Sequence, residues 1–425
     1  MNDHLRILVV LPMYGGSLPV GRCAARGLSE LGHIVETLDA PAFHPAFTAL
    51  KSLRVSTERL DQLENSFLGL VSQAVLAKVE QFRPDLVLAL AQAPLSRQAL
   101  KRLRQDGVPT VMWFVEDHRL FTYWQTFAPW YDFFFVIQKS SFLEKLASLG
   151  VTNAFYLPLA AQPDIHRPLD LGPVERRRFG SDLSFMGAGY PNRRLAFRDL
   201  AGMKFRIWGT EWEGDPVLEP LVQNAGARVG TEDAVRIFNA THINLNLHSS
   251  INAKQAVVPG DFINPRTFEI ASCGAFQLVD RRSLLPELFE SDEMITFASM
   301  KELRDLVDHY LPREEERQSV AARARKRVLA EHTYAHRMAT LLETVARHRP
   351  DWPRPQKADP VRNLGIDPEL GREVEALVAE LGLPEDVSFP DLAWAVRQRS
   401  GRLSPLETSI LFLDEWKKLY APKSG

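Results

Sequence analysis

The first 160 residues alternate short apolar runs with longer segments of helical periodicity. The runs, each predicted to form a β-strand, are LRILVVL (5–11), HIVETLD (33–39), DLVLALA (85–91), TVMWFV (110–115), DFFFVI (132–137) and AFYLPL (154–159). A helical pattern that ends at Gly32 separates the first two, since glycine favours the position after a helix. Continuous apolar strands separated by helices are typical of a parallel sheet covered on both faces. Residues 1–160 are therefore predicted to form an α/β domain.

A polar stretch punctuated by proline, PLAAQPDIHRPLDLGPVERRRFG (158–180), interrupts this pattern and predicts a linker over residues 161–180. The alternation then restarts, with strands expected at DLSFMG (182–187), KFRIWG (204–209), INLNLH (243–248), AFQLVD (275–280) and MITF (294–297). Helices are expected over residues 299–347, so a second Rossmann-like domain is assigned to residues 181–347. Ligands bind such sheets at the carboxyl ends of the strands, here facing a cleft between two α/β domains.

The composition changes again beyond residue 348. The proline-rich HRPDWPRPQKADP predicts a connector, and a helical piece is expected over residues 367–421. Residues 348–425 are therefore assigned to a helical extension. Its last segment, LSPLETSILFLDEWKKLY, offers an apolar stripe that predicts either a homodimer through these helices or docking on an acceptor.

Composition argues against several classes of protein. A chain of 425 residues is long enough for two domains with their own cores. Its formal net charge of -2 gives no general attraction to nucleic acid or to an anionic membrane. The apolar run near the N-terminus is too short for a signal peptide, and no run reaches the roughly 18 residues of a membrane span. Two distant cysteines, Cys23 and Cys273, suit a reducing compartment, so we expect a cytoplasmic protein without a membrane span.

The segment DFINPRTFEIASCGAFQLVD (261–280) concentrates the strongest chemical signal. Asn264 suits a helix N-cap, Pro265 suits the first helical position, and Gly274 stands where a helix of about nine residues would end. This helix follows a strand and a loop, so its N-terminus should face the cleft. Its free N–H groups and the positive end of its dipole would then form a seat for phosphate.

Charged side chains surround that helix start. Arg266, in the first turn beside Thr267, could donate charge-assisted hydrogen bonds to the phosphate. Glu269 lies about one turn into the helix and could accept two hydroxyl protons from a ribose. Asp261, in the preceding loop, would lie on the side where a sugar follows the diphosphate. Each carboxylate alone is more often a solvated or turn-forming group, but their joint placement favours a nucleotide-sugar site.

Other loops that follow predicted strands supply further candidates. MYGGS (13–17) would let a substrate lie close to the backbone. GAGYPN (187–192) lacks the third glycine of a dinucleotide-binding fingerprint, so it is a weak signal for NAD and an acceptable turn beside a phosphate. Either loop could equally be a plain glycine turn; the candidates in the two loops are Gly15, Gly16, Gly187 and Tyr190. Trp208 could border the base, and His248 also points at the cleft, although a lone histidine there is more often structural.

The run EDH (116–118) follows the strand TVMWFV and so should lie at the cleft. Any of Glu116, Asp117 and His118 could accept a proton from an acceptor hydroxyl or hold that hydroxyl in line. Helix capping by Asp117, with its neighbours solvated, is the equally weighted alternative. The aromatic segment RLFTYWQTFAPWY could stack on a sugar or peptide face, although most of it is expected in the core.

Four segments resemble GT-B glycosyltransferases, and more closely the CgeB-type (spore maturation protein) glycosyltransferases. They are LPLAAQPDIHRP, LSFMGAGYPNRR, FNATHINLNLH, and NPRTFEIASCGAFQLVD with the following LLPELF. The resemblance spans about residues 110–345 and leaves the C-terminal piece outside. It implies the GT-B fold, in which two Rossmann-like domains face a cleft.

The resemblance also implies roles for individual residues. GT-B enzymes of the family-4 type carry two acids separated by seven residues, and Asp261 and Glu269 have that spacing, with Asp where Glu is commoner. Glu269 would then bind the nucleotide ribose and Asp261, with a shorter reach, the donor sugar. A basic residue near the start of the second domain, Arg193 or Arg194, would contact the donor phosphate. No metal and no cofactor beyond the nucleotide diphosphate sugar are expected, and the sugar would be transferred with retention.

The expected function is glycosyl transfer from a nucleotide diphosphate sugar to a hydroxyl of a protein, a saccharide or a small molecule. Two alternatives stay open. A nucleotide-sugar 2-epimerase would share the fold but needs several acids and bases around the sugar, for which the sequence offers EDH and Asp261. The second alternative is a non-catalytic binding or assembly protein, since CgeB-like proteins are associated with spore surfaces. The complete acid pair and Arg266 favour an intact site.

Overall fold

The first apolar runs form a six-stranded parallel sheet, as the sequence predicts. The computed structural model describes residues 4–353, 361 and 365–420. The strand order is β2-β1-β3-β4-β5-β6. The strands are β1 Arg6–Val10, β2 Ile34–Leu38, β3 Leu86–Leu90, β4 Thr110–Phe114, β5 Phe133–Val136 and β6 Ala154–Tyr156. Every side chain of the four inner strands is buried, whereas the edge strands β2 and β6 are partly exposed, because helices cover both faces of the sheet.

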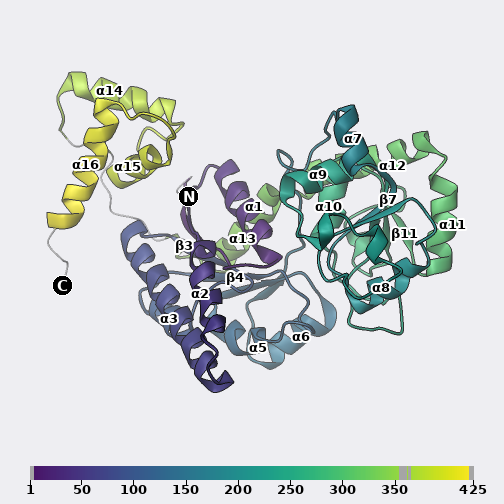
Figure 1. Ribbon diagram of the computed structural model, residues 1–425. Helices are drawn as coiled ribbons and strands as arrows, with labels where there is room; N and C mark the ends of the chain where they lie inside the picture. Colours follow the sequence, from purple (N-terminus) through teal and green to yellow (C-terminus); the bar gives the residue numbers. More distant parts are fainter. Residues whose placement is uncertain (1–3, 354–360, 362–364, 421–425) are drawn as a thin grey trace. The chain divides into compact units, whose positions relative to one another are not determined.

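The second set of apolar runs forms a five-stranded parallel sheet in the order β11-β10-β9-β7-β8. The strands are β7 Ser181–Met186, β8 Phe205–Trp208, β9 Thr241–Asn246, β10 Gln277–Asp280 and β11 Ile295–Phe297. The two sheets belong to one compact unit, residues 1–352, in which they lie side by side (Figure 1). Both ends of every strand lie within two residues of their predicted positions except for β6, which ends three residues early, because uninterrupted apolar runs bounded by turns leave little choice of register.

Helices connect the strands and cover the two sheets (Figure 1). Those of residues 1–352 are α1 Ser17–Glu30, α2 His44–Leu50, α3 Thr57–Phe82, α4 Arg97–Gln105, α5 Trp124–Phe127, α6 Ser140–Ser148, α7 Pro173–Phe179, α8 Pro191–Arg198, α9 Thr231–Ala240, α10 Pro265–Ser272, α11 Met300–Tyr310, α12 Glu314–Glu331 and α13 Tyr334–His348. Over the described residues, none of the helices combines the length and the apolar character needed to cross a bilayer.

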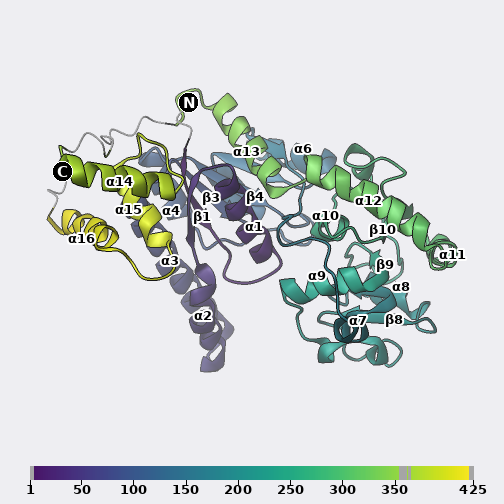
Figure 2. The ribbon, with the colours of Figure 1, turned by 90° about the horizontal axis from the view of Figure 1, so that it is seen from above.

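The last helix of this unit crosses from the second domain to the first. α12 packs on the second domain, and α13 continues beside α1 (Figure 2). The crossing is fixed where the N–H of Tyr334 donates to the carbonyl of Ala161 over 3.0 Å. Met338 and Leu341 of α13 are fully buried and join the apolar core of the first domain. Residues assigned by sequence to the second domain therefore complete the core of the first.

Residues 353–425 form a second compact unit. Its described helices are α14 Pro368–Glu380, α15 Phe389–Gln398 and α16 Pro405–Tyr420. They enclose a small core formed by Val374, Leu377, Val378, Leu392, Val396 and Ile410. On α16, Phe412, Leu413 and Trp416 are 66%, 48% and 53% exposed, so part of the predicted apolar stripe lies on the surface and its partner stays a prediction. Most of the expected connector, residues 354–360, lies outside the described residues.

Gly27→Ala should destabilise the protein, because the new methyl group would meet the backbone of α13. A Cβ at Gly27 would lie 2.7 Å from the carbonyl carbon of Tyr334, and no side-chain rotation relieves this contact. We expect the free energy of unfolding to fall by about 1–3 kcal/mol. The melting temperature, followed by circular dichroism, should fall with it.

Gly69→Ala in α3 is the matched control. A Cβ at Gly69 would meet nothing within 4 Å, so alanine adds helix propensity without a clash. The control should gain about 0.5–1 kcal/mol of stability. Equal melting temperatures for the two variants would contradict the close packing of α1 on α13.

Candidate functional site

The predicted helix at the centre of the site forms as α10, Pro265–Ser272. The Asn264 side chain accepts the N–H of Thr267 over 3.2 Å, and Gly274 has a φ of +66° just beyond the helix end. The capping residues therefore act as the sequence predicts. The helix start offers fewer free donors than expected, because Pro265 has no N–H and that of Thr267 is capped. Among the first three helical residues, the amide of Arg266 remains for a ligand.

A buried histidine and carboxylate hold the loop that leads into α10. The Nδ1 atom of His248 lies 2.6 Å from a carboxylate oxygen of Asp280, and its Nε2 atom accepts the N–H of Asn264 over 2.9 Å. Because Nε2 is an acceptor, Nδ1 carries the proton and donates it to Asp280. Burial lowers the pKa of His248 to about 4 although Asp280 opposes the shift, so the ring is neutral at pH 7. Both ring nitrogens are engaged inside the protein, so His248 positions the N-cap of α10 and does not face outward toward a donor.

Arg282 extends this network to the rest of the loop. Its guanidinium lies 3.3 Å from Asp280 and donates to the carbonyls of Phe262 and Val258 over 3.1 and 2.9 Å. A Cβ at Gly260 would lie 2.0 Å from an Arg282 nitrogen, so any other residue there would displace the guanidinium from these partners. The backbone on both sides of Asp261 is thereby fixed.

Two arginines meet beside the start of α10. Arg193, on α8, is 9% exposed, and its guanidinium donates to the carbonyls of Leu247 and Ala188 over 2.9 and 3.0 Å. It lines a narrow pocket together with Asn264 and Arg266. Burial lowers the pKa of Arg193 to about 10, with a further contribution from Arg266, so the side chain remains charged at pH 7. Two cations beside a helix N-terminus form a site for an anion.

Arg194, in contrast, joins two loops of the second domain. Its guanidinium donates to the carbonyls of Gly189 and Glu213 over 2.9 and 3.0 Å, which joins the loop after β7 to the loop after β8. The two loops come so close that a Cβ at Gly189 would lie 2.1 Å from the carbonyl oxygen of Glu211. Of the two arginines proposed for the phosphate, Arg193 is the one that lines the pocket.

The remaining candidates of the second domain lie around these loops. Gly187 allows Arg193 to approach, since a Cβ there would lie 3.2 Å from its guanidinium. Tyr190 is the N-cap residue of α8, with the guanidinium of Arg193 5.4 Å from its ring centre. Trp208 is 6% exposed and packs 6.0 Å from Phe179, so its ring belongs to the core and not to a base-binding surface. The hydroxyl of Thr267 accepts a hydrogen bond from Asn246 and is fully buried.

Glu269 lies one turn into α10 and is 6% exposed. It forms an ion pair with Arg266, and Nε2 of His166 lies 3.9 Å from its second oxygen. Burial alone would raise the pKa of Glu269, but Arg266 and His166 together hold it below its ordinary value. The residue is therefore a charged acceptor, and its partner Arg266 is the cation that the sequence assigns to phosphate.

Asp261 joins the two domains. Its carboxylate accepts the Nε2–H of Gln138 over 3.2 Å and the backbone N–H of Lys139 over 3.1 Å, both from the loop after β5 of the first domain. The Lys139 side chain forms an ion pair with Glu287 of the second domain. The two carboxylates of the acid pair thus have different surroundings: Glu269 is buried within the second domain, and Asp261 faces the first.

Glu116 has neutral hydrogen-bond partners. Its carboxylate accepts the Nε2–H of Gln92 over 2.5 Å and the hydroxyl of Tyr123 over 2.9 Å. Burial raises the pKa of Glu116, because two neutral donors compensate for lost water less well than a cation would.

Asp117 and His118, the other two residues of EDH, are held by an arginine and by a stacked aromatic ring. Asp117 accepts hydrogen bonds from the backbone and guanidinium of Arg119, the shortest over 2.9 Å. His118 is stacked on Phe142 with ring centres 4.3 Å apart, and its Nδ1 lies 2.9 Å from Oε1 of Gln138. Burial lowers the pKa of His118, which keeps the ring neutral. Asp117 therefore shapes the turn, and His118 orients the glutamine that reaches Asp261.

Several residues of this site are absent from the sequence prediction. They are Gln92, Gln138, Lys139, His166 and Arg228, whereas Tyr123 belongs to the aromatic segment that the sequence marks as a possible stacking surface. The glutamines and Lys139 follow strands, so the rule that marked EDH would have found them. Arg228 and His166 lie in loops that no periodicity marks. The guanidinium of Arg228 donates to the carbonyl of Gly15 over 2.9 Å, which places the MYGGS loop against the second domain. Gly16, the other candidate in this loop, is the N-cap residue of α1.

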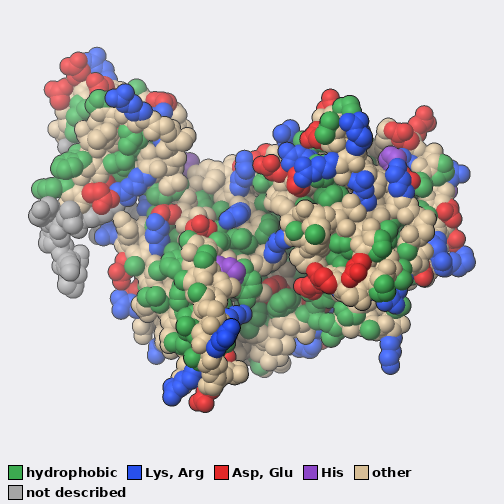
Figure 3. Space-filling view, viewed as in Figure 1, with side chains coloured by type: hydrophobic (Ala, Val, Ile, Leu, Met, Phe, Trp, Pro, Cys, Tyr) green, Lys and Arg blue, Asp and Glu red, His purple; other side chains and the backbone are tan. Residues whose placement is uncertain are grey.

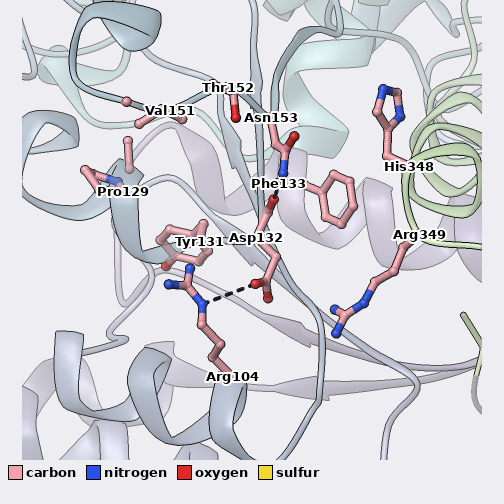
Figure 4. A pocket seen from close by; sticks show the side chains of 12 residues that line it. Arg104, Pro129, Tyr131, Asp132, Phe133, Val151, Thr152, Asn153, His348 and Arg349 are labelled. Atoms are coloured by element: carbon pink, nitrogen blue, oxygen red, sulfur yellow. Dashed lines mark hydrogen bonds and ion pairs between the residues drawn. The ribbon is translucent and has the colours of Figure 1, made fainter. Parts of the chain in front are cut away.

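A separate pocket of about 430 Å³ lies at the opposite edge of the first sheet, near the amino ends of β5 and β6 (Figure 4). Asp132 there accepts hydrogen bonds from the N–H and the hydroxyl of Thr110 over 2.9 and 3.0 Å. Arg104 points toward the same carboxylate (Figure 4). Asp132 thus joins the starts of β4 and β5, and none of the predicted site residues lines this pocket.

Comparisons with known proteins relate this chain to glycosyltransferases. The family model described as Glycosyl transferase-like matches residues 193–343, which include Arg193, Asp261 and the whole of α10. Spore protein CgeB of Bacillus subtilis (strain 168) is 27% identical over 269 residues, covering 61% of this chain and 82% of that protein. The match therefore concerns most of the relative and leaves part of this chain without a counterpart.

Solved structures share the fold. Anabaena HepE, in a complex with UDP and glucose, has a TM-score of 0.56 at 12% identity, covering 81% of this chain and 100% of that one. Sucrose-phosphate synthase of Thermosynechococcus elongatus has a TM-score of 0.53 at 11% identity, covering 81% and 99%. At these identities the likeness concerns the fold, and the match to the Glycosyl transferase-like family model relates the second domain to glycosyl transfer. The chain thus has the fold of GT-B glycosyltransferases, is similar to Spore protein CgeB, matches the Glycosyl transferase-like family model over residues 193–343, and carries an additional helical unit at its C-terminal end.

Proposed function

We propose that this chain transfers a sugar from a nucleoside diphosphate sugar to an acceptor hydroxyl, with retention at the anomeric carbon and without a metal. The observation that carries the donor assignment is the position of Arg193 and Arg266 beside the start of α10, where they line a cavity of about 20 Å³ that would have to widen to admit a phosphate group. Two guanidinium groups and a helix N-terminus match the charge of a diphosphate. Glu269 would accept hydrogen bonds from the ribose, and Asp261 from the donor sugar.

The two arginines would also supply the main stabilisation of the leaving group. As the bond between the anomeric carbon and the diphosphate oxygen breaks, negative charge develops on that oxygen. Preorganised cations in a site with little water stabilise such charge more strongly than solvent does. Because Arg193 is already held by two carbonyls, it would need little reorganisation during the reaction. This arrangement supports a reaction that needs no metal ion.

Retention would follow from attack on the face from which the leaving group departs. The acceptor oxygen would bond to the anomeric carbon as the diphosphate leaves, and the acceptor proton would pass to the departing phosphate oxygen. An inverting reaction would need a base on the opposite face. Asp117 is bound to Arg119, and His118 contacts Gln138, which supports a mechanism in which neither removes the proton. Glu116 would hold the acceptor hydroxyl.

Uracil is the first base to test. Anabaena HepE, whose fold this chain shares, was solved with UDP and glucose. The residues described above would contact the diphosphate, which is common to all candidate donors, and the ribose, which is common to all of them except dTDP-linked sugars. A thermal-shift panel of UDP, GDP, ADP, CDP and dTDP would therefore select the nucleotide for the experiments below.

Glu269→Gln should weaken nucleotide binding through the ribose. The amide loses charged hydrogen bonds to the two hydroxyls, so the affinity for UDP in isothermal titration should fall by about 1–3 kcal/mol. The wild type should prefer UDP strongly to 2′,3′-dideoxy-UDP, and the variant should hardly distinguish them. An undiminished preference for UDP in Glu269→Gln would refute the ribose role.

Arg193 and Arg194 form a matched pair of neighbouring residues. Arg193→Gln should weaken UDP binding by about 1.5–3 kcal/mol, because a charged hydrogen bond to the diphosphate is lost. Arg194→Gln should leave UDP affinity nearly unchanged. UMP serves as the control for folding: Arg193→Gln should affect UMP less than UDP, whereas a collapsed site would weaken both equally. Equal losses for the two arginine variants would reject the assignment.

The stereochemistry can be followed without a known acceptor. Water should slowly replace the acceptor, so the enzyme should hydrolyse the selected nucleotide sugar. Proton NMR at early times should show the released sugar with the anomeric configuration of the donor, and excess EDTA should not change the rate. The opposite anomer would overturn retention. Accumulation of the 2-epimer of the donor would identify the chain as an epimerase instead.

A further inference from the structure

A pocket of about 990 Å³ in the first domain is not used by the donor site. It is comparable in volume with pockets of roughly 300–1,000 Å³ that hold small molecules. One wall is a face of α3, formed by Asn65, Leu68, Gly69 and Gln73. The opposite wall is the segment after EDH, with Tyr123, Thr126, Phe127 and Tyr131. The aromatic run that the sequence marks as a possible stacking surface thus contributes directly to a pocket.

The lining is aromatic and nearly uncharged. The rings come from Tyr14, Phe47, Tyr123, Phe127 and Tyr131. Among the described residues that line the pocket, Arg97 is the one ionised side chain, and it is exposed. Amide and hydroxyl groups, such as those of Asn65 and Thr126, offer uncharged hydrogen bonds. Such a lining favours a ligand with an apolar body and disfavours a cation, for which it has no carboxylate.

Two residues of the pocket wall are hydrogen-bonded to Glu116, and one of them lies beside a loop that contacts the second domain. Gln92 and Tyr123 line the pocket, and both donate to the Glu116 carboxylate. Gln92 has a φ of +65°, a strained conformation that is held by its N–H, which donates to the hydroxyl of Tyr123 over 2.8 Å. The neighbouring Gly15 bonds to Arg228 of the second domain. The Gln92 end of the pocket therefore lies beside a loop that contacts the second domain, where the proposed donor site is.

Apolar surface continues outside the pocket. Tyr14, Leu63 and Leu70 are 49%, 38% and 63% exposed. Hydrophobic side chains are visible on the surface over α2 and α3 (Figure 3). Tyr14 both lines the pocket and is exposed, so apolar surface begins at the pocket itself.

We infer that the acceptor carries an apolar aryl or alkyl body, which fills this pocket while its hydroxyl points to Glu116. The inference rests on the proposed transfer and narrows the acceptor to an uncharged amphipathic molecule. The aromatic walls would bury the apolar body, and the carboxylate would accept a hydrogen bond from the hydroxyl. A strongly hydrophilic saccharide would leave the aromatic walls in contact with water and gain little from the pocket.

Isothermal titration of the full chain with simple glucosides tests this inference. Octyl β-D-glucoside below its micelle concentration and 4-nitrophenyl β-D-glucoside supply apolar bodies, and methyl β-D-glucoside is the polar control. The wild type should bind both apolar probes about tenfold or more tightly than the methyl glucoside, because apolar surface is removed from water.

Two tryptophan variants locate the binding. Gly69→Trp fills the pocket from its α3 wall, where a Cβ would meet nothing within 4 Å, and should abolish the preference for apolar probes. Gly371→Trp is the matched control, since Gly371 also lies in a helix with open space around its Cβ, and should keep the preference. UDP affinity should be the same in all three proteins.

The outcomes separate this inference from the proposed function. Wild-type protein that binds UDP but shows no preference for the apolar probes would overturn the inference alone. A preference that survives in Gly69→Trp would place the probes elsewhere and would also overturn it. Loss of the preference in Gly69→Trp together with failure of any nucleotide to bind would support the pocket and reject the proposed donor chemistry.

Discussion

The buried contact between His248 and Asp280 is the interaction on which the proposed donor site depends. Both residues stand at the ends of neighbouring strands, so the sheet brings them together without help from the loop. Asp280 orients the ring, and the ring accepts the N–H of Asn264. A charged imidazolium has no lone pair and could not accept that bond, so the neutral ring is a structural requirement. The start of α10 is thus fixed by the sheet.

The carboxylates of the site differ in the charge of the groups that donate hydrogen bonds to them. Asp117 and Glu269 are paired with arginines, as buried charges usually are, and these pairs stabilise their ionised forms. Asp261 has an amide and a backbone N–H, and Glu116 has an amide and a phenol. The two carboxylates with neutral partners are those assigned here to the sugar and to the acceptor. Neutral donors can be exchanged for substrate hydroxyls without leaving an unpaired charge, which suits residues that must bind polar, uncharged groups.

The strands and α10 could be predicted from the sequence because their signals are local. Apolar runs define the strands, and Asn264, Pro265 and Gly274 define one helix through backbone chemistry alone. The partners of each functional side chain could not be predicted from the sequence, because they depend on which loops the two sheets bring together. Arg193 and Arg194 are adjacent and chemically identical, and only the position of the carbonyl groups around them shows that one lines the pocket and the other joins two loops. His248 illustrates the same limit, since its role follows from Asp280 on another strand.

The two domains are held together by contacts of unequal strength. α13 buries apolar side chains in the core of the first domain and forms a permanent link. On the substrate side the links are polar: Arg228 to Gly15, and Gln138 and Lys139 to Asp261. Hydrogen bonds of this kind contribute about 0.5–1.5 kcal/mol each, so they can be replaced while α13 stays in place. If the donor sugar binds Asp261 as proposed, it would share this carboxylate with Gln138 and Lys139 of the first domain, so donor binding would be coupled to the contact between the domains.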